Sequence, residues 1–188
     1  AVISGINFEL QKYIPNQVGR FDDSFNINCT GDYFTNRGYA TILFEAGHYT
    51  NDYNREEVRK FVFIALKAAI SFVNENDIVS NDLQNYLNIY QNNKCFYDFI
   101  FKNIKINYDG IEIITNFAAQ YKEELVDGKI QLNAYVAEIG DLKGKFGHYQ
   151  YNAHKMTYAD SLENIPKINQ KANFSLGKGI KFVNGVKI

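Results

Sequence analysis

Apolar residues recur at helical spacing in two stretches before residue 80. Between residues 1 and 14 they lie three and four positions apart, and the pattern stops at Pro15, which predicts a helix with one apolar face. A second helix is expected over residues 55–74, with Asn54 as its N-cap and Glu57 as the capping-box partner. Its predicted buried face consists of Val58, Phe61, Val62, Ala65, Ala69, Phe72 and Val73.

The stretch between these helices contains one segment with the pattern of a buried strand. Residues 16–38 are polar and punctuated by glycine, so they are expected to form a loop. Residues 39–46 are apolar on both faces, which is typical of a strand covered from both sides in an α/β sheet. The strand ends at Glu45, and a loop with Gly47 and His48 follows at once.

The rest of the chain has the patterns of β-structure. After a short amphipathic segment at residues 82–90, a strand is expected at Cys95–Asn107. Asp109-Gly110 and Asp127-Gly128 each lie between two apolar runs, which predicts tight hairpin turns. The tail, Ala172–Ile188, is expected to form short strands interrupted by glycines.

Together these elements predict an α+β protein with two domains. Residues 1–80 would hold the remnant of an α/β sheet with two flanking helices. Residues 81–188 would form a small, mostly antiparallel β domain. The boundary is placed in the polar run that ends near Asn81.

Composition narrows the class of protein. The 188 residues are 46% hydrophobic and carry a net charge of −1, so we expect a globular protein that binds neither nucleic acid nor a membrane. Cys29 and Cys95 are far apart and lack metal-ligand or redox spacing, so each is expected to be a free, partly buried thiol, which leaves the compartment open. The sequence starts in the middle of a helical pattern, and Met156 is its one methionine, as expected of a fragment or a processed form.

Glu45 is the strongest candidate for chemistry. An unpaired carboxylate is costly to bury at the end of an apolar strand, and ligands of open α/β sheets bind at the carboxyl ends of strands. The alternative is a structural carboxylate that is paired with Arg20 or Arg37. Two roles are also open for His48. It either positions Glu45 or substrate, or it is a hydrogen-bonding residue of the loop.

The order of these elements resembles the carboxypeptidase A-like zinc metallocarboxypeptidase family. In that family a loop with specificity residues precedes a strand that delivers the catalytic glutamate, and a long helix follows. Asn28–Phe34 and Thr41–Glu45 resemble the family's approach to its general base. Pro15–Asp23 and Phe44–Tyr49 resemble a bacterial, Bacteroidetes-type branch, and the likeness covers roughly residues 1–75.

This resemblance implies roles for individual residues. Glu45 would be the general base, and Gly31 and Asp32 would lie near the specificity pocket. Further candidates for contact with a peptide or amide substrate are Arg20, Asp23 and His48. The family's zinc ligands, a His-x-x-Glu pair and a later histidine, are absent from this sequence.

The resemblance therefore implies that zinc is bound in the complete enzyme and not by this chain alone. A missing N-terminal catalytic half would supply the metal, and the chain alone is expected to be inactive. Apolar residues such as Ile3, Ile42 and Phe44 would need cover, which predicts either self-association as a homo-oligomer or dependence on the missing half. The alternative function is a non-catalytic binding or docking module built on a degenerate peptidase scaffold.

Overall fold

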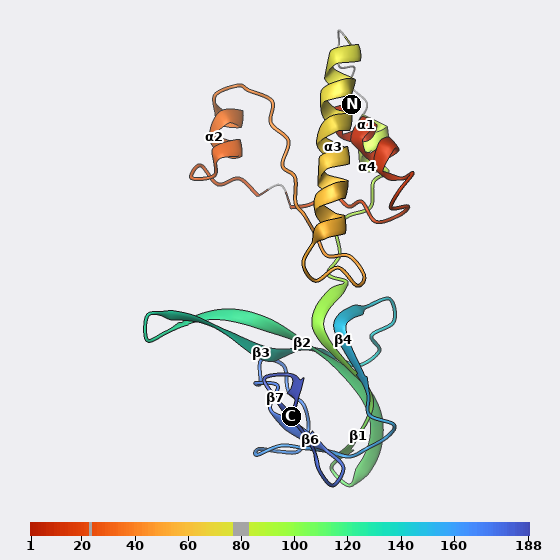
Figure 1. The fold of residues 1–188 in the computed structure, drawn as a ribbon, viewed down its shortest axis with the longest axis vertical. Coiled ribbons are helices and arrows are strands. Elements are labelled where there is room, and N and C mark those ends of the chain that lie inside the picture. The colour runs from red at the N-terminus through yellow and green to blue at the C-terminus, as the bar shows by residue number, and fades with distance from the viewer. Residues whose placement is uncertain (23, 77–82) are drawn as a thin grey trace. The chain divides into compact units, whose positions relative to one another are not determined.

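The structure is a computed structural model that describes residues 1–22, 24–76 and 83–188 (Figure 1). The chain divides into two compact units, Ala1–Lys94 and Cys95–Ile188. Helices make up the first unit and strands make up the second, so the α+β class is confirmed. The boundary expected between residues 80 and 81 lies outside the described residues.

Two helices form the core of the first unit. In α1 (Val2–Leu10), Ile6 and Leu10 are buried and pack with Ala65 of α3 (Glu56–Glu75). Both helices were expected from their apolar spacing. A shorter helix, α4 (Leu83–Leu87), belongs to the amphipathic segment predicted there.

The loop expected over residues 16–38 contains a further helix, α2 (Thr30–Asn36). Gly38 follows it with a left-handed φ of 87°, and its N–H donates to Thr35 O, while the N–H of Tyr39 donates to Phe34 O. These bonds satisfy carbonyl groups at the end of the helix. The prediction was wrong here because it treated Gly38 as loop punctuation, whereas this glycine ends a helix.

The strand expected at residues 39–46 is not formed. The segment has no regular hydrogen-bonded partner, and the described part of the first unit contains only an isolated β-bridge between Arg20 and Gln91. A strand is stabilised through the backbone bonds that it makes with a neighbouring strand. The sequence pattern was that of a strand, but the described residues of this unit supply no neighbour.

Eight strands form two sheets in the second unit. The larger sheet has the order β3-β2-β1-β4, with β1 and β4 parallel and the other pairs antiparallel. Its strands are β1 (Phe96–Tyr108), β2 (Ile111–Val126), β3 (Lys129–Ile139) and β4 (Phe146–Asn152). The smaller antiparallel sheet consists of β5 (Tyr158–Ala159), β6 (Phe174–Leu176), β7 (Ile180–Val183) and β8 (Val186–Lys187).

Both hairpin turns predicted from the sequence are confirmed. Asp109 and Gly110 have φ of 50° and 86°, and they join β1 to β2 at the pair Tyr108–Ile111. Asp127-Gly128 joins β2 to β3 in the same way. Two successive left-handed residues match the right-handed twist of the strands, which explains why Asp-Gly was informative.

An aromatic cluster holds the two sheets of this unit together. Phe101 of β1 and Phe117 of β2 are fully buried, and they contact Phe174 of β6 and Phe182 of β7. The cysteines are both free, but Cys29 is exposed and only Cys95 is partly buried, which corrects the expectation for Cys29.

Candidate functional site

Glu45 is exposed at the end of a segment that is anchored on the helical core. Ile42 and Phe44 of that segment are half-buried and pack against the cluster formed by α1 and α3. Neither arginine proposed as a structural partner reaches Glu45. Arg20 donates through Nε to Ile89 O at 2.9 Å, and Nε of Arg37 lies 3.3 Å from the hydroxyl of Tyr33. The reading of Glu45 as the partner of one of these arginines is therefore wrong.

Arg55 holds the loop that follows Glu45. Its Nη1 donates to Ala46 O at 3.0 Å, and its Nη2 lies 3.2 Å from Nε2 of His48. Arg55 has a left-handed φ of 60° at the start of α3. The side chain thus connects the long helix to the two residues that flank Gly47. The sequence did not single out Arg55, because the contact depends on the path of the loop.

Asp52 caps α3 in place of the expected Asn54. Its carboxylate accepts the backbone N–H of Val58 at 2.9 Å, and the residue is 7% exposed. Burial alone would raise the pKa of Asp52. The N–H groups of Val58, Glu57 and Glu56 and the charge of Arg59 outweigh that effect, so the pKa lies below its usual value of 3.8. The carboxylate can therefore satisfy donors that the helix itself leaves unpaired.

Replacing Asp52 by alanine is expected to lower the thermal midpoint of the helical unit by about 4–8 °C at neutral pH, because α3 loses its cap. The native carboxylate contributes stability above its unfolded pKa, and this contribution is lost as the pH falls through the lower folded pKa. Thermal denaturation followed by far-ultraviolet circular dichroism would measure both effects.

Asp52→Asn is the matched control. Its amide oxygen can still accept the N–H of Val58, but it has no charge to lose. We expect it to keep most of the stability at neutral pH and to show a weaker dependence on acid. An alanine variant that melts with the native chain would contradict the assigned cap.

Gly31 and Asp32 occupy the start of α2. The carbonyl of Gly31 accepts the hydroxyl of Thr41 at 3.3 Å and that of Thr35 at 3.0 Å. Asp32 accepts the N–H of Asn26 at 2.8 Å through Oδ2. The structure therefore connects Gly31 to the segment that leads to Glu45, whereas the described contact of Asp32 closes its own loop.

Arg20 joins two distant parts of the unit. Its N–H donates to Tyr90 O at 2.7 Å, and its guanidinium lies 5.4 Å from the ring centre of Tyr86. The neighbouring Asp22 accepts both the N–H and the hydroxyl of Ser24, and this hydrogen bonding lowers its pKa. Asp23 lies outside the described residues. Within the described residues, Arg20 thus contacts the segment around α4 and not Glu45.

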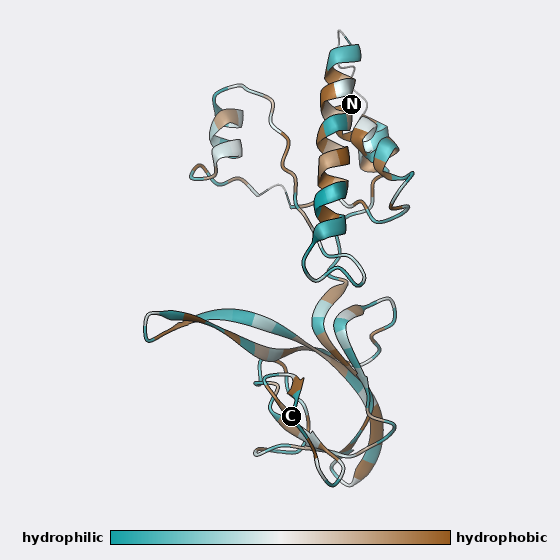
Figure 2. Cartoon of the chain, viewed as in Figure 1, coloured by the Kyte–Doolittle hydropathy of each residue, from teal (hydrophilic) through white to brown (hydrophobic). Residues whose placement is uncertain are grey.

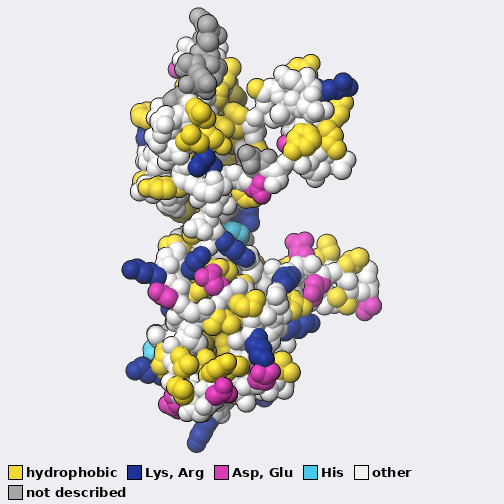
Figure 3. Space-filling view, turned by 180° about the vertical axis from the view of Figure 1, so that it is seen from behind, with side chains coloured by type: hydrophobic (Ala, Val, Ile, Leu, Met, Phe, Trp, Pro, Cys, Tyr) yellow, Lys and Arg dark blue, Asp and Glu magenta, His cyan; other side chains and the backbone are white. Residues whose placement is uncertain are grey.

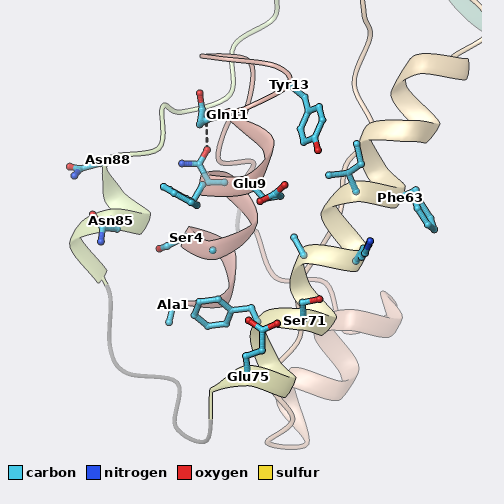
Figure 4. Close-up of a pocket in the computed structure, with 17 residues that line it drawn as sticks. Ala1, Ser4, Glu9, Gln11, Tyr13, Phe63, Ser71, Glu75, Asn85 and Asn88 are labelled. Carbon is cyan, nitrogen blue, oxygen red and sulfur yellow. Dashed lines mark hydrogen bonds between the residues drawn. The ribbon is translucent and has the colours of Figure 1, made fainter.

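A pocket of about 830 Å³ lies between α1, α3 and α4 (Figure 4). Ser4 and Glu9 of α1 and Ser71 and Glu75 of α3 are on its walls. The pocket includes none of the residues predicted to form a site. We therefore place the candidate site at Glu45 and the loop held by Arg55, outside this pocket.

The described residues do not fit a zinc site. In residues 1–22, 24–76 and 83–188, no three histidine, cysteine, aspartate or glutamate side chains gather so that they could hold a metal ion. We therefore derive no reaction step through a metal from these residues. In the same described ranges, no helix has both the length and the apolar character needed to cross a membrane.

The comparisons with known proteins add no relative to this picture. No family model matches the chain, and neither does a curated protein or a solved structure.

Proposed function

We propose that the first unit is part of a zinc-dependent carboxypeptidase-like peptidase domain and that it supplies Glu45 as the general base. The observation that carries this proposal is the state of Glu45, which is exposed and, among the described residues, makes no ion pair or hydrogen bond. A general base must be free to exchange a proton with water and must be held in place by its surroundings. Ile42 and Phe44 anchor the segment before Glu45, and Arg55 holds the loop after it.

Glu45 would take a proton from the attacking water and deliver it to the leaving amine of a peptide or amide substrate. Gly31 would contribute through its carbonyl, which accepts the hydroxyl of Thr41 in the segment that leads to Glu45. His48 follows in the loop that Arg55 orders. Zinc would have to be held by polypeptide outside this sequence, because the described residues do not form its site.

The uncovered apolar surface of the first unit supports its membership of a larger domain. Figure 3 shows hydrophobic side chains gathered on the surface of this unit. Large aromatic side chains of this unit are exposed, with Phe8 72% exposed and Phe63 67% exposed. Helix α3 is apolar on more sides than its neighbours cover (Figure 2), and its expected buried face was wrong at Val73, which is 56% exposed. Contiguous apolar surface of this kind normally contacts another polypeptide.

The proposal is tested by expressing the chain together with the coding sequence upstream of residue 1. We expect this longer polypeptide to release C-terminal amino acids from peptides, and a zinc chelator to stop the reaction. The present chain alone is expected to release none. Release by the chain alone, or an inactive longer polypeptide that lacks a His-x-x-Glu pair, would contradict the proposal.

A docking module is the second candidate function, and the β2–β3 hairpin favours it. Figure 1 shows this hairpin extending as an arm from the rest of its sheet. Leu125 and Ile130 form a cross-strand pair near its tip and are 75% and 71% exposed. Paired residues of an antiparallel hairpin lie on the same face, so these two side chains make an apolar surface that a partner could cover.

A further inference from the structure

The turn between β7 and β8 consists of Asn184 and Gly185. Val183 and Val186 form the last pair of the two strands, so the turn has only these two residues. Their φ angles are 53° and 78°, and two successive left-handed residues are typical of a type I′ turn, in which asparagine and glycine are favoured. This is also the one place in the sequence where asparagine directly precedes glycine.

An asparagine before a glycine is chemically labile. The side-chain carbonyl carbon of asparagine can be attacked by the backbone nitrogen of the next residue, and asparagine is a thermolabile residue for this kind of reason. Glycine exposes its backbone nitrogen most, because it has no Cβ to crowd the approach. Asn184 therefore has the neighbour that makes this reaction fastest in a flexible chain.

The side chain of Asn184 attaches the turn to the edge of the larger sheet. Its Oδ1 accepts the N–H of Ala134 at 2.5 Å, and its Nδ2 donates to Leu132 O at 2.8 Å. Ala134 and Leu132 both belong to β3, which is an edge strand of that sheet. The side-chain amide thus makes the two hydrogen bonds that a peptide unit of a neighbouring strand would make.

The backbone of the turn is held by the segment that precedes β6. The N–H of Asn184 donates to Oδ1 of Asn173 at 2.7 Å, and the N–H of Gly185 donates to Ala172 O at 2.9 Å. Gly185 is buried, and a Cβ at this position would lie 2.7 Å from the ring of Phe99. Both residues of the turn are therefore fixed in the folded second unit.

We propose that Asn184 is a deamidation site that reacts when the β7–β8 hairpin opens, and that its conversion weakens the attachment of the smaller sheet to β3. This inference is independent of the proposed function. The backbone nitrogen of Gly185 attacks the side-chain carbonyl carbon of Asn184 and forms a carbon–nitrogen bond. The bond to the side-chain NH2 group breaks, and ammonia leaves with the proton of the attacking nitrogen.

Water completes the reaction by opening the five-membered succinimide ring. Its hydroxyl group adds to one of the two ring carbonyl carbons, the bond from that carbon to the nitrogen breaks, and the proton of the water returns to the nitrogen. Opening at the side-chain carbonyl leaves aspartate. Opening at the backbone carbonyl leaves isoaspartate, which adds an extra carbon atom to the backbone of the turn.

The folded hairpin protects Asn184 from this reaction. The nitrogen of Gly185 attacks after it has lost its proton, and in the folded turn that proton is donated to Ala172 O. The side-chain amide of Asn184 is fixed on β3 by two hydrogen bonds, so it is not free to rotate toward the attacking nitrogen. The rate of deamidation should therefore follow the population of the open hairpin.

The product no longer matches the edge of β3. A carboxylate accepts hydrogen bonds and donates none. One of its oxygens can still accept the N–H of Ala134, but the other would face Leu132 O, to which Asn184 had donated. Two oxygens without a proton between them repel each other, and the carbonyl of Leu132 loses a partner. The reaction is thus a one-way change that follows opening of the hairpin and favours further opening.

Peptide mapping by mass spectrometry tests the protection. The full chain is incubated at mildly alkaline pH, either folded or in a denaturing concentration of urea. We expect Asn184 to deamidate at least about 100-fold faster in the denatured chain. Asn173 is the internal control, because the bulk of Phe174 shields the next backbone nitrogen and reaction should be slow in both states.

Either of two results would overturn the proposed site. Equal rates for Asn184 in the folded and the denatured chain would show that the hairpin does not control the reaction. A denatured chain in which Asn184 reacts no faster than Asn173 would show that the site is not labile.

Asn184→Asp tests the consequence of the reaction, since it places the carboxylate of the product in the turn. We expect the amide of Gly185 to exchange its hydrogen about 10-fold faster or more, because the hairpin opens more often. Asn173→Asp is the matched control. It makes the same change of charge, but Oδ1 of Asn173 acts as an acceptor, and a carboxylate accepts equally well. A native exchange rate at Gly185 in the Asn184 variant would overturn the proposed weakening.

Discussion

Replacing Phe101 by alanine is expected to lower the thermal midpoint of the second unit by roughly 15–30 °C, because the cost is a large part of the free energy of unfolding of a domain of this size. Phe101 is 0% exposed, and its ring centre lies 4.8 Å from that of Phe117 and 4.9 Å from that of Phe174. Truncation of a buried phenylalanine costs about 3–5 kcal/mol, since it removes apolar contact and leaves a cavity.

The effect should be large because Phe101 lies where the two sheets meet. It comes from β1 of the larger sheet and contacts Phe174 and Phe182 of the smaller sheet. The small sheet has short strands with few backbone bonds of its own, so its position depends on this contact.

Thermal denaturation of the full chain, followed by near-ultraviolet circular dichroism of the aromatic residues, would measure the change. Leu125→Ala is the matched control in the same sheet. Leu125 is 75% exposed, so its truncation is expected to cost less than about 0.5 kcal/mol. A Phe101 variant that melts with the native protein would show that the aromatic cluster does not join the sheets.

Glu45→Gln is expected to reduce kcat of the longer polypeptide by about 100- to 10,000-fold. Glutamine has nearly the same shape as glutamate but cannot take up the proton of the attacking water. KM should change little, because the proposed role of Glu45 lies in proton transfer and not in the binding of substrate. Steady-state assays of C-terminal amino-acid release would give both constants.

Glu57→Gln is the control for loss of a carboxylate in the same unit. Glu57 is exposed on α3 and pairs with Lys60 at 3.2 Å, and such surface pairs contribute little to stability. We expect native kcat from this variant. Because Glu45 is exposed, its glutamine variant should keep the fold. Retention of native kcat by Glu45→Gln would exclude Glu45 as the general base.

The predictions that succeeded depend on short-range properties of the chain. The apolar spacing before residue 15 and after residue 55 predicted the two main helices, because residues three and four apart share one face of a helix. Asp109-Gly110 and Asp127-Gly128 predicted the hairpins, because the required left-handed backbone favours these residue pairs.

The predictions that failed depend on partners that are distant in sequence or outside the chain. Residues 39–46 have the composition of a strand, yet no strand forms without a neighbour to complete its backbone bonds. The cap of α3 was assigned to Asn54, but a left-handed turn at Arg55 brings Asp52 to the N–H of Val58 instead. Neither outcome could be derived from the local pattern, because each depends on the path of the backbone.

The candidate site also has features that the sequence indicated and features that only the structure revealed. The position of Glu45 in the sequence was enough to single it out, because a carboxylate that directly follows apolar residues is expected to have a functional or structural role. Only the tertiary structure showed that Arg20 donates a hydrogen bond to Ile89 and that Arg55 donates one to the loop after Glu45. Long side chains can reach many partners, and the partner that they contact is decided by how the chain folds back on itself.

The sequence by itself determined where helices and hairpins form and which carboxylate stands out, because helical periodicity and turn geometry act between residues a few positions apart. The tertiary structure alone decided which arginine contacts which loop, which apolar faces stay uncovered and that residues 41–45 lack a neighbouring strand. Those features arise from contacts between residues that are far apart in the chain, and the free energy of such contacts depends on the whole packed arrangement.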